Sequence, residues 1–205
     1  MLAFGMIDIT QDKTYQLIEG THPVLITAPH VFNHKRPSLS ASIKQAEPWT
    51  DYIAKAVAEG SKSYGLILRN DSSYDPNYQK EDNNPFKQTI RRIVEQSNCK
   101  YLIDIHGLHD RHRYDLGIFY ERRYYKSKEL AYKVAEALNV GKLRGVLIQN
   151  FNFPEGGQET LSEFTVHELK IPAVQIEVAR YIREDPILRE ELIKHLTGAV
   201  SGLIN

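Results

Sequence analysis

Short apolar runs alternate along this chain with segments in which apolar residues recur every three or four positions. The apolar runs occupy residues 24–28, 64–69, 101–105, 116–120 and 173–178, and residues 145–149 are also extended in character. Their length and their content of β-branched residues predict buried strands. Because helical segments separate them, the pattern predicts an α/β fold, and the length of the chain suits a single domain spanning residues 1–205.

The helical segments each show one apolar side. A helix is predicted from about Glu47, following a polar loop, with Trp49, Ile53, Ala56 and Val57 on its buried side. Three further apolar sides consist of Phe86, Ile90, Ile93 and Val94; of Leu130, Val134, Ala135 and Leu138; and of Leu188, Leu192, Leu196, Ala199 and Leu203. The last set predicts that a C-terminal helix packs on the core. Gly156 and Gly157 are expected to break the chain before a helix around residues 159–169.

Three predicted strands carry a chemically active side chain at or near their carboxyl end. His30 and His106 follow two of the apolar runs, and Glu177 lies inside a third. Open α/β sheets place their active sites at this edge, where two histidines can share a metal ion. An unpaired carboxylate inside an apolar strand would be costly to bury, so Glu177 either serves chemistry or pairs with a cation such as Arg180. The trio predicts a metal-hydrolase site.

The two histidines also have plain structural interpretations. His30 alone is consistent with a surface or capping histidine, and His106 with a simple pair formed by Asp104, which stands two residues earlier on the same face. In a metal site, the same Asp104 would orient or tune its neighbour. Gly107 permits a sharp turn or the close approach of a ligand.

A hydrolytic zinc ion usually has three protein ligands and one open position. Glu47 and Asp51, at the start of the helix that follows His30, are candidates for the third ligand. An acid at a helix N-terminus also stabilises the helix dipole, so either residue has a purely structural alternative. His109 and His112 are further alternatives, in a loop rich in charged residues that solvent would accommodate.

Composition narrows the class of protein. Lys plus Arg and Asp plus Glu balance at 26 each, so no overall charge favours nucleic acid or an anionic membrane. Cys99 is the one cysteine, which excludes an internal disulfide and a multi-thiolate zinc cluster. The sequence lacks a secretory signal, a membrane-length apolar run and a Gly-x-Ser-x-Gly elbow, so we expect a cytoplasmic protein that is not a serine hydrolase.

Five short motifs stand in order between residues 24 and 183. They are Ala28-Pro29-His30, Lys44-x-Ala46-Glu47-x-x-Thr50, Asp104-Ile105-His106-Gly107, Arg113-x-Asp115-Leu116-Gly117 and Gln175-Ile176-Glu177-Val178-Ala179-Arg180. In this order they resemble the motifs of the N-formylglutamate amidohydrolase family, whose core fold is similar to that of the zinc carboxypeptidases. The resemblance implies an open mixed, mostly parallel sheet flanked by helices, of phosphorylase/hydrolase-like architecture.

The resemblance also implies roles for four residues: zinc ligands at His30, Glu47 and His106, and the catalytic carboxylate at Glu177. The implied reaction is zinc-dependent hydrolysis of the amide bond of a small N-acyl amino acid, N-formyl included, or of a peptide-like amide. Metal-activated water would be the nucleophile and Glu177 the general base. Manganese, iron and cobalt accept similar nitrogen and oxygen ligands, so zinc is one of several candidate metals.

A substrate carboxylate would need a cation, and arginine can bind it through two parallel hydrogen bonds. Arg113 and Arg180 are the candidates, with Arg69 as a third. Residues 75–77 resemble a family Asp-x-Asn-Arg pattern, but Tyr78 stands where the arginine is expected. The alternative function is therefore a non-catalytic metal- or carboxylate-binding protein on the same scaffold. The presence of a general base beside both histidines favours the enzyme.

Overall fold

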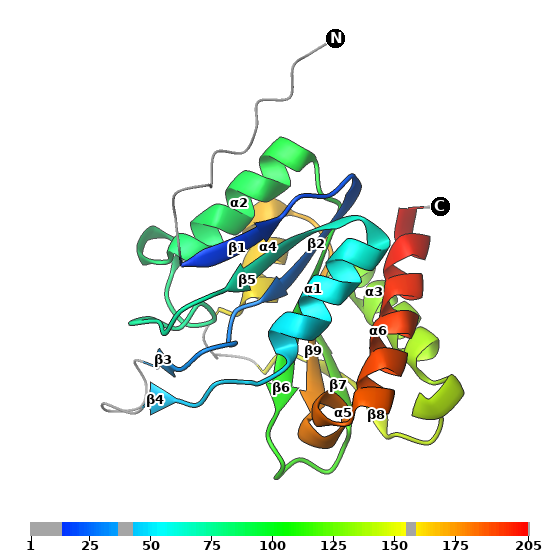
Figure 1. The fold of residues 1–205 in the computed structure, drawn as a ribbon. Helices are drawn as coiled ribbons and strands as arrows, with labels where there is room; N and C mark the ends of the chain where they lie inside the picture. Colours follow the sequence, from blue (N-terminus) through cyan, green and yellow to red (C-terminus); the bar gives the residue numbers. More distant parts are fainter. Residues whose placement is uncertain (1–13, 37–42, 155–158, 205) are drawn as a thin grey trace.

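A seven-stranded mixed sheet forms the centre of the computed structural model, which describes residues 14–36, 43–154 and 159–204 (Figure 1). In spatial order the strands are β1 (Tyr15–Ile18), β5 (Ser63–Leu68), β2 (His22–Ala28), β6 (Tyr101–Leu108), β9 (Ala173–Ala179), β7 (Leu116–Tyr120) and β8 (Ile148–Asn152). A separate two-stranded sheet pairs β3 (His34–Lys35) with β4 (Ile43–Lys44). Gly156 and Gly157, the predicted chain break, lie outside the described residues.

The four middle strands β5, β2, β6 and β9 run parallel to one another. β1 pairs antiparallel with β5, and β7 pairs antiparallel with β9 but parallel with β8. The next strand of this sheet after β2 in the sequence is β5, which lies on the side of β2 away from β6. The next strand after β6 is β7, which lies on the side of β6 away from β2. Adjacent strands whose connections diverge in this way form the crevice in which open α/β sheets bind ligands.

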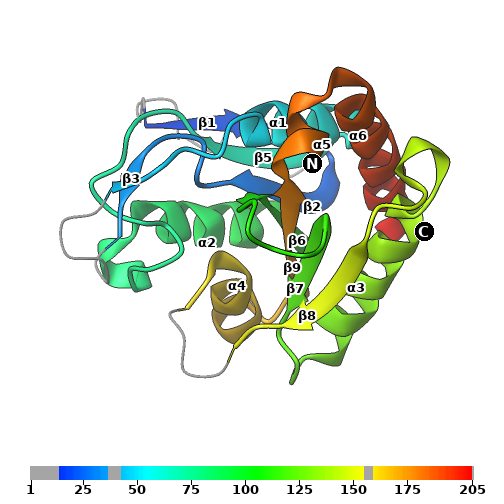
Figure 2. The ribbon, with the colours of Figure 1, turned by 90° about the horizontal axis from the view of Figure 1, so that it is seen from below.

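Helices cover both faces of the sheet. α1 (Thr50–Ser61), α3 (Tyr125–Leu138) and α6 (Pro186–Ser201) lie on one face, and α2 (Pro85–Ser97) and α4 (Leu161–Leu169) on the other (Figure 2). The short segments are α5 (Arg180–Glu184) and the 3₁₀ turns η1 (Glu81–Asn83), η2 (Gly141–Leu143) and η3 (Gly202–Ile204). Among the described residues, no helix combines the length and apolar composition that crossing a membrane requires.

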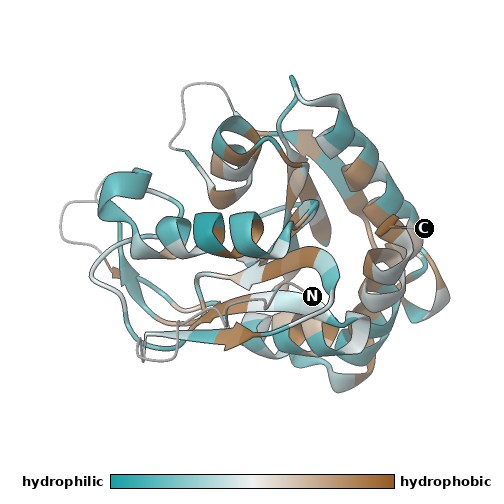
Figure 3. Ribbon diagram, turned by 90° about the horizontal axis from the view of Figure 1, so that it is seen from above, coloured by the Kyte–Doolittle hydropathy of each residue, from teal (hydrophilic) through white to brown (hydrophobic). Residues whose placement is uncertain are grey.

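Two apolar clusters form the core, one on each face of the sheet (Figure 3). On the face of α2 and α4, three adjacent strands are apolar at their amino ends and polar at their carboxyl ends. The residues are Leu25 then Thr27 in β2, Leu102 then Asp104 and His106 in β6, and Ala173 then Gln175 and Glu177 in β9. Because alternate residues of a strand share a face, this pattern gathers the polar side chains at one edge of the sheet.

Local sequence explains where several helices begin. Thr160 and Glu163 form a capping box before α4, in which each side chain accepts the other residue's backbone N–H. The Asn84 side chain accepts the Lys87 N–H at the start of α2, and Asp185 caps α6, directly ahead of a proline at the first helical position. The predicted C-terminal helix is confirmed and packs against α1 and α3.

α1 begins at Thr50 rather than near Glu47, which corrects the predicted helix start. The Glu47 N–H donates to the His30 carbonyl at 2.9 Å, and Trp49 adopts a left-handed φ of 71° ahead of the helix. Trp49 is consequently 41% exposed, with the Arg189 guanidinium 3.9 Å from its ring centroid, so its predicted place in the buried stripe is wrong. This early break leaves Glu47 in a loop, free of helical geometry.

The edges of the sheet differ from the sequence-based expectation. β1 has no counterpart in that expectation, because its four residues show no strict alternation between apolar and polar types. β8 begins at Ile148, whereas the extended character of the sequence suggests a start near Gly145. Gly145 instead has a φ of 98°, a left-handed conformation that ends the preceding turn.

Cys99 lies in the connection between α2 and β6, as the sequence suggests, and is 2% exposed. Burial raises the pKa of its thiol to about 12, so the thiol stays protonated at neutral pH. A protonated, enclosed sulfur is a poor nucleophile, which argues against cysteine-based catalysis.

Candidate metal centre

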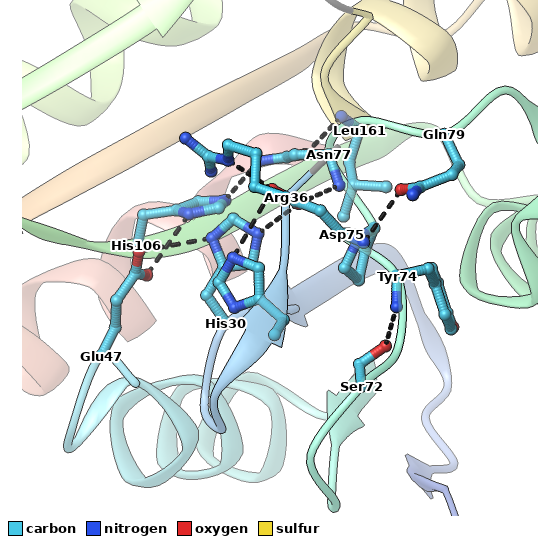
Figure 4. Close-up of polar contacts among 12 residues, drawn as sticks. His30, Arg36, Glu47, Ser72, Tyr74, Asp75, Asn77, Gln79, His106 and Leu161 are labelled. Atoms are coloured by element: carbon cyan, nitrogen blue, oxygen red, sulfur yellow. Dashed lines mark hydrogen bonds and ion pairs between the residues drawn. The ribbon is translucent and has the colours of Figure 1, made fainter. Parts of the chain in front are cut away.

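His30, Glu47 and His106 converge at the carboxyl edge of β2 and β6 (Figure 4). His30 stands two residues past β2, and Glu47 comes from the loop before α1. The Nδ1 atom of His30 is 3.3 Å from Glu47 Oε1, and that of His106 is 3.4 Å from Glu47 Oε2. One ligand atom from each of the three residues lies within 4.8 Å of the other two. The structure thus brings together the three residues for which the family resemblance implies a ligand role.

His106 lies inside β6 and not just past its end, where the apolar pattern places it. β6 continues to Leu108, and His106 pairs in register with Glu177 of β9. Gly107 consequently makes no turn. Its N–H donates to Glu47 Oε2 at 2.9 Å, so the close approach that this glycine permits is to the Glu47 side chain.

A buried carboxylate holds the second ring nitrogen of each histidine. Nε2 of His30 donates to Asp75 Oδ1 at 2.8 Å, and Nε2 of His106 donates to Asp104 Oδ2 at 2.7 Å. Metal-binding histidines almost always donate their other N–H in this way, which fixes the ring and its tautomer. The Nδ1 atoms are therefore left to face Glu47, as a shared cation would require.

Both supporting carboxylates are fully buried and have partners on each oxygen. Asp104 Oδ1 accepts the Thr27 hydroxyl at 2.6 Å. Asp75 Oδ1 also accepts the Asn77 N–H at 2.9 Å, and its Oδ2 accepts Nε of Arg36 at 2.6 Å. A buried carboxylate with these bonds is held in one orientation, because breaking any of them leaves a desolvated charge.

The electrostatics of the cluster favour a positive charge at its centre. Burial is the largest single effect and acts to lower the pKa of both histidines. The charges and hydrogen bonds of Glu47 and Asp75 on His30, and of Asp104 and Glu47 on His106, together outweigh burial and raise both pKa values. Burial acts to raise the pKa of Glu47, but His30 and His106 hold it well below its ordinary value. A carboxylate that stays ionised between two imidazoles is a suitable donor set for a divalent transition metal.

A second group of potential ligands consists of His30, His34 and Asp75. The rings of His30 and His34 are stacked, with centroids 4.1 Å apart and planes 10° from parallel. An imidazole binds a metal in the plane of its ring, and one ion cannot lie in two separated parallel planes. The first group, whose two histidine rings stand at 78° to each other, therefore fits a metal ion better.

Glu177 lies beside the cluster on the neighbouring strand. Gln175 donates from Nε2 to Glu177 Oε1 at 2.7 Å, and within the part of the chain that the structure describes Oε2 has no such donor. Burial raises the pKa of Glu177, with Glu47 adding to the effect and His106 opposing it. Arg180 donates instead to Glu184 at 2.7 Å, so the predicted alternative, an ion pair between Glu177 and Arg180, does not form.

The other candidate ligands lie apart from this cluster. Asp51 is in the first turn of α1, and His109 and His112 are exposed in the loop after β6. None of them belongs to either group of potential ligands found among the described residues. Of the two acids between which the sequence leaves the choice open, Glu47 is the one in the cluster.

The predicted substrate-binding arginines lie outside the cluster. Arg113 is exposed in the loop that precedes β7, Arg69 is exposed after β5, and the Arg180 side chain is 58% exposed. Arg180 does line a cavity of about 390 Å³ that begins immediately beyond the site. Leu108 and Ala179, two residues further along β6 and β9 than His106 and Glu177, are among its lining residues.

Several residues of the site have no signal in the apolar pattern. His34, Arg36 and Asn77 lie in loops or in the short β3 strand, where periodicity carries no information. Asp75 stands in a motif that resembles the family's, but nothing in the sequence indicates its contact with His30. The one local signal is turn chemistry, since the Asn77 N–H bonds to the Asp75 side chain two residues earlier.

We expect Gly107→Ala to disturb the metal centre. A Cβ atom there would lie 2.9 Å from the Cβ of Glu47 and from the guanidinium carbon of Arg183, so both must shift, at a cost of about 1–3 kcal/mol. Metal affinity should fall, measured by competition with a chelator. Gly198→Ala in α6 is the matched control: no atom lies within 4 Å of its Cβ position, and it should stabilise the fold slightly. Unchanged metal affinity in Gly107→Ala would contradict the close packing of Glu47 against residue 107.

Comparison with protein-family models and with curated proteins finds no match. Solved structures do match: a gene product of Agrobacterium tumefaciens has a TM-score of 0.65 at 11% identity, covering 93% of this chain and 94% of its own. A metallo-carboxypeptidase from Burkholderia cenocepacia has a TM-score of 0.57 at 14% identity, covering 93% of this chain and 65% of its own.

A succinylglutamate desuccinylase from Chromobacterium violaceum has a TM-score of 0.55 at 12% identity, with 91% of this chain and 65% of its own covered. This chain therefore spans about two thirds of the length of the carboxypeptidase and the desuccinylase. The similarities confirm the predicted fold class, a carboxypeptidase-like α/β fold around a mixed, mostly parallel sheet.

Proposed function

We propose that this protein is a zinc-dependent amidohydrolase of the N-formylglutamate amidohydrolase kind. Its substrate is a small N-acyl amino acid, N-formyl included, or a peptide-like amide that carries a carboxylate. It acts in the cytoplasm on small molecules, without a nucleic-acid or membrane partner. His30, Glu47 and His106 hold the metal, and Glu177 is the general base.

The observation that carries the proposal is the paired support of the two histidines. Each imidazole has its Nε2 fixed by a buried aspartate, and both Nδ1 atoms point at the same glutamate. Three protein ligands with an open fourth position are the usual arrangement of hydrolytic zinc. A structural role for the histidines would not require both Nδ1 atoms to face one ionised carboxylate.

The reaction needs a base and an acid within reach of the metal. A zinc ion held by His30, Glu47 and His106 would supply an activated water, with a pKa lowered towards about 7, and would polarise the substrate carbonyl. Glu177 would accept a proton from this water as the water oxygen bonds to the carbonyl carbon, and would pass the proton to the amine nitrogen as the C–N bond breaks. Gln175 fixes Oε1 of Glu177, so the proton transfers run through Oε2.

The fold comparisons support this class of chemistry. Two of the similar structures are named for hydrolases, a metallo-carboxypeptidase and a succinylglutamate desuccinylase. The second name describes removal of the acyl group from an N-acyl amino acid, which is the reaction type proposed here.

The proposal is tested on protein purified without a chelator and without a nickel column. Elemental analysis should find about one zinc, or another divalent transition metal, per chain. A panel of N-formyl, N-acetyl and N-succinyl amino acids should then show release of free amine that a chelator abolishes and added zinc restores. Absence of metal in protein that has been offered zinc and dialysed would overturn the hydrolase and leave a ligand-binding scaffold.

A further inference from the structure

A carboxylate-bearing substrate needs a cation that still has hydrogen-bond donors to offer. The two arginines favoured by the sequence are poorly placed for this, since Arg113 is exposed in a loop and Nε of Arg180 is occupied by Glu184. Arg183 is nearer, but it is 3% exposed and donates to the carbonyls of Val178 and Pro48. It therefore braces the chain around Glu47.

Arg36 contacts Asp75, the carboxylate that supports His30. Its Nε donates to Asp75 Oδ2 at 2.6 Å, and Asp75 Oδ1 in turn accepts from His30. The Arg36 side chain is 20% exposed whereas Asp75 is fully buried, so Arg36 is the member of this pair that solvent reaches. Figure 4 shows Arg36 bonded to Asp75 next to His30.

Most N–H groups of the Arg36 guanidinium have no acceptor among the described residues. Arginine has five N–H donors, and only the one on Nε has an acceptor among the described residues. The two terminal nitrogens form a planar fork whose spacing matches the two oxygens of a carboxylate. Asp75 accepts from Nε and not from the two terminal nitrogens. The oxygens of Asp75 are also in contact with His30 and His34.

The cavity beyond Glu177 disfavours an anion. Its lining includes the carboxylates of Asp110, Asp115 and Glu184, and its one arginine, Arg180, is already paired with Glu184. Burial and the charge of Arg111 lower the pKa of His112, another lining residue, so its ring tends to be neutral. A negatively charged part of the substrate is therefore repelled there and favoured on the Arg36 side.

We propose, building on the hydrolase function above, that Arg36 is the specificity-determining residue that binds the substrate carboxylate through its terminal nitrogens. The uncharged remainder of the substrate then extends towards the cavity lined by Leu108, Tyr114 and Ala179. Arg36 has a second role as a positioning residue, because its Nε holds the aspartate that orients His30. The experiment must separate these two roles.

The test measures binding by calorimetry in the zinc-loaded Glu177→Gln protein, which should bind ligand without turnover. The ligands are N-acetyl-L-leucine and its uncharged carboxamide, N-acetyl-L-leucinamide. Adding Arg36→Gln should weaken binding of the carboxylate about tenfold to a hundredfold, as loss of a charge-assisted bidentate contact does, and change binding of the carboxamide less than about twofold. Arg113→Gln and Arg180→Gln, made in the same background, should leave the preference for the carboxylate unchanged.

Zinc content is measured for each variant. If Arg36→Gln loses zinc, Arg36→Lys decides, since it keeps the charge near Asp75 but loses the fork. Equal weakening of both ligands in zinc-loaded protein, loss of the preference in Arg113→Gln or Arg180→Gln instead, or no binding of the carboxylate to the parent protein would overturn the role of Arg36. Failure of the hydrolase proposal would look different: Arg36-dependent binding with no metal-dependent release of amine from the wild-type protein.

Discussion

His106→Ala should purify with almost no metal, whereas the wild type retains about one ion per chain. Removing a residue that merely supports a ligand lowers metal affinity about 10–100-fold, so loss of the ligand itself should exceed a hundredfold. Hydrolysis should fall with the metal. Elemental analysis and chelator competition measure the first effect, and amine release the second.

The same substitution should destabilise the metal-free protein. It leaves Asp104 fully buried, with the Thr27 hydroxyl as its one remaining side-chain partner among the described residues, and breaking a buried pair costs about 3–5 kcal/mol. A circular dichroism spectrum and a urea titration show whether the variant still folds. Asp104→Asn is a milder substitution, because it keeps the side-chain volume and the His106 ligand, and it should bind metal more weakly than the wild type.

The matched control is His167→Ala, in which the same side chain is removed from an exposed position on α4. It should bind metal and turn over substrate like the wild type. A His106→Ala protein that folds and still holds a full complement of metal would contradict the assignment of this histidine.

Glu177→Gln should keep its metal and lose activity. The substitution preserves volume and can still accept the hydrogen bond from Gln175, but an amide cannot take a proton from water at neutral pH. Loss of a general base typically lowers the rate about 10²–10⁴-fold. Steady-state kinetics should place this loss in kcat, with the metal content unchanged.

This variant also separates the enzyme from the alternative, a metal- or carboxylate-binding protein. In a binding protein the wild type would bind ligand without turnover, and Glu177→Gln would bind it equally well. Glu59→Gln is the control, since Glu59 is exposed and pairs with Lys55 on α1, outside the cluster and the cavity. Activity of Glu177→Gln within a few fold of the wild type would remove Glu177 from the mechanism.

The strands that carry His30, His106 and Glu177 could be predicted from sequence, because each is a short apolar run with a polar residue near its carboxyl end. Parallel strands bring such ends to one edge, so the meeting of the three residues followed from the fold class. The position of His106 inside β6 could not be predicted in the same way. A histidine inside a strand and one just past it look alike when glycine comes next.

The rest of the cluster depends on loop geometry. The apolar pattern predicts Glu47 to be a helix N-terminal acid, because nothing in it indicates that Trp49 turns left-handed and delays the helix. Asp75 and His34 contact His30, and Arg36 contacts Asp75, through side-chain bonds and ring stacking from loops and the two-residue strand β3. Such bonds have no period along the sequence, so only the three-dimensional structure reveals them.

The position of β9 has a consequence for the order in which the chain matures during synthesis. Although β9 is the last strand along the sequence, it lies inside the sheet between β6 and β7. The half-sheet β1-β5-β2-β6 and the proposed ligands are complete once the ribosome has released residue 108, whereas Glu177 arrives only with β9. A nascent chain can thus gather the three proposed metal ligands well before the proposed base arrives, and its last strand both seals an open sheet edge and supplies the carboxylate that the proposed hydrolysis needs.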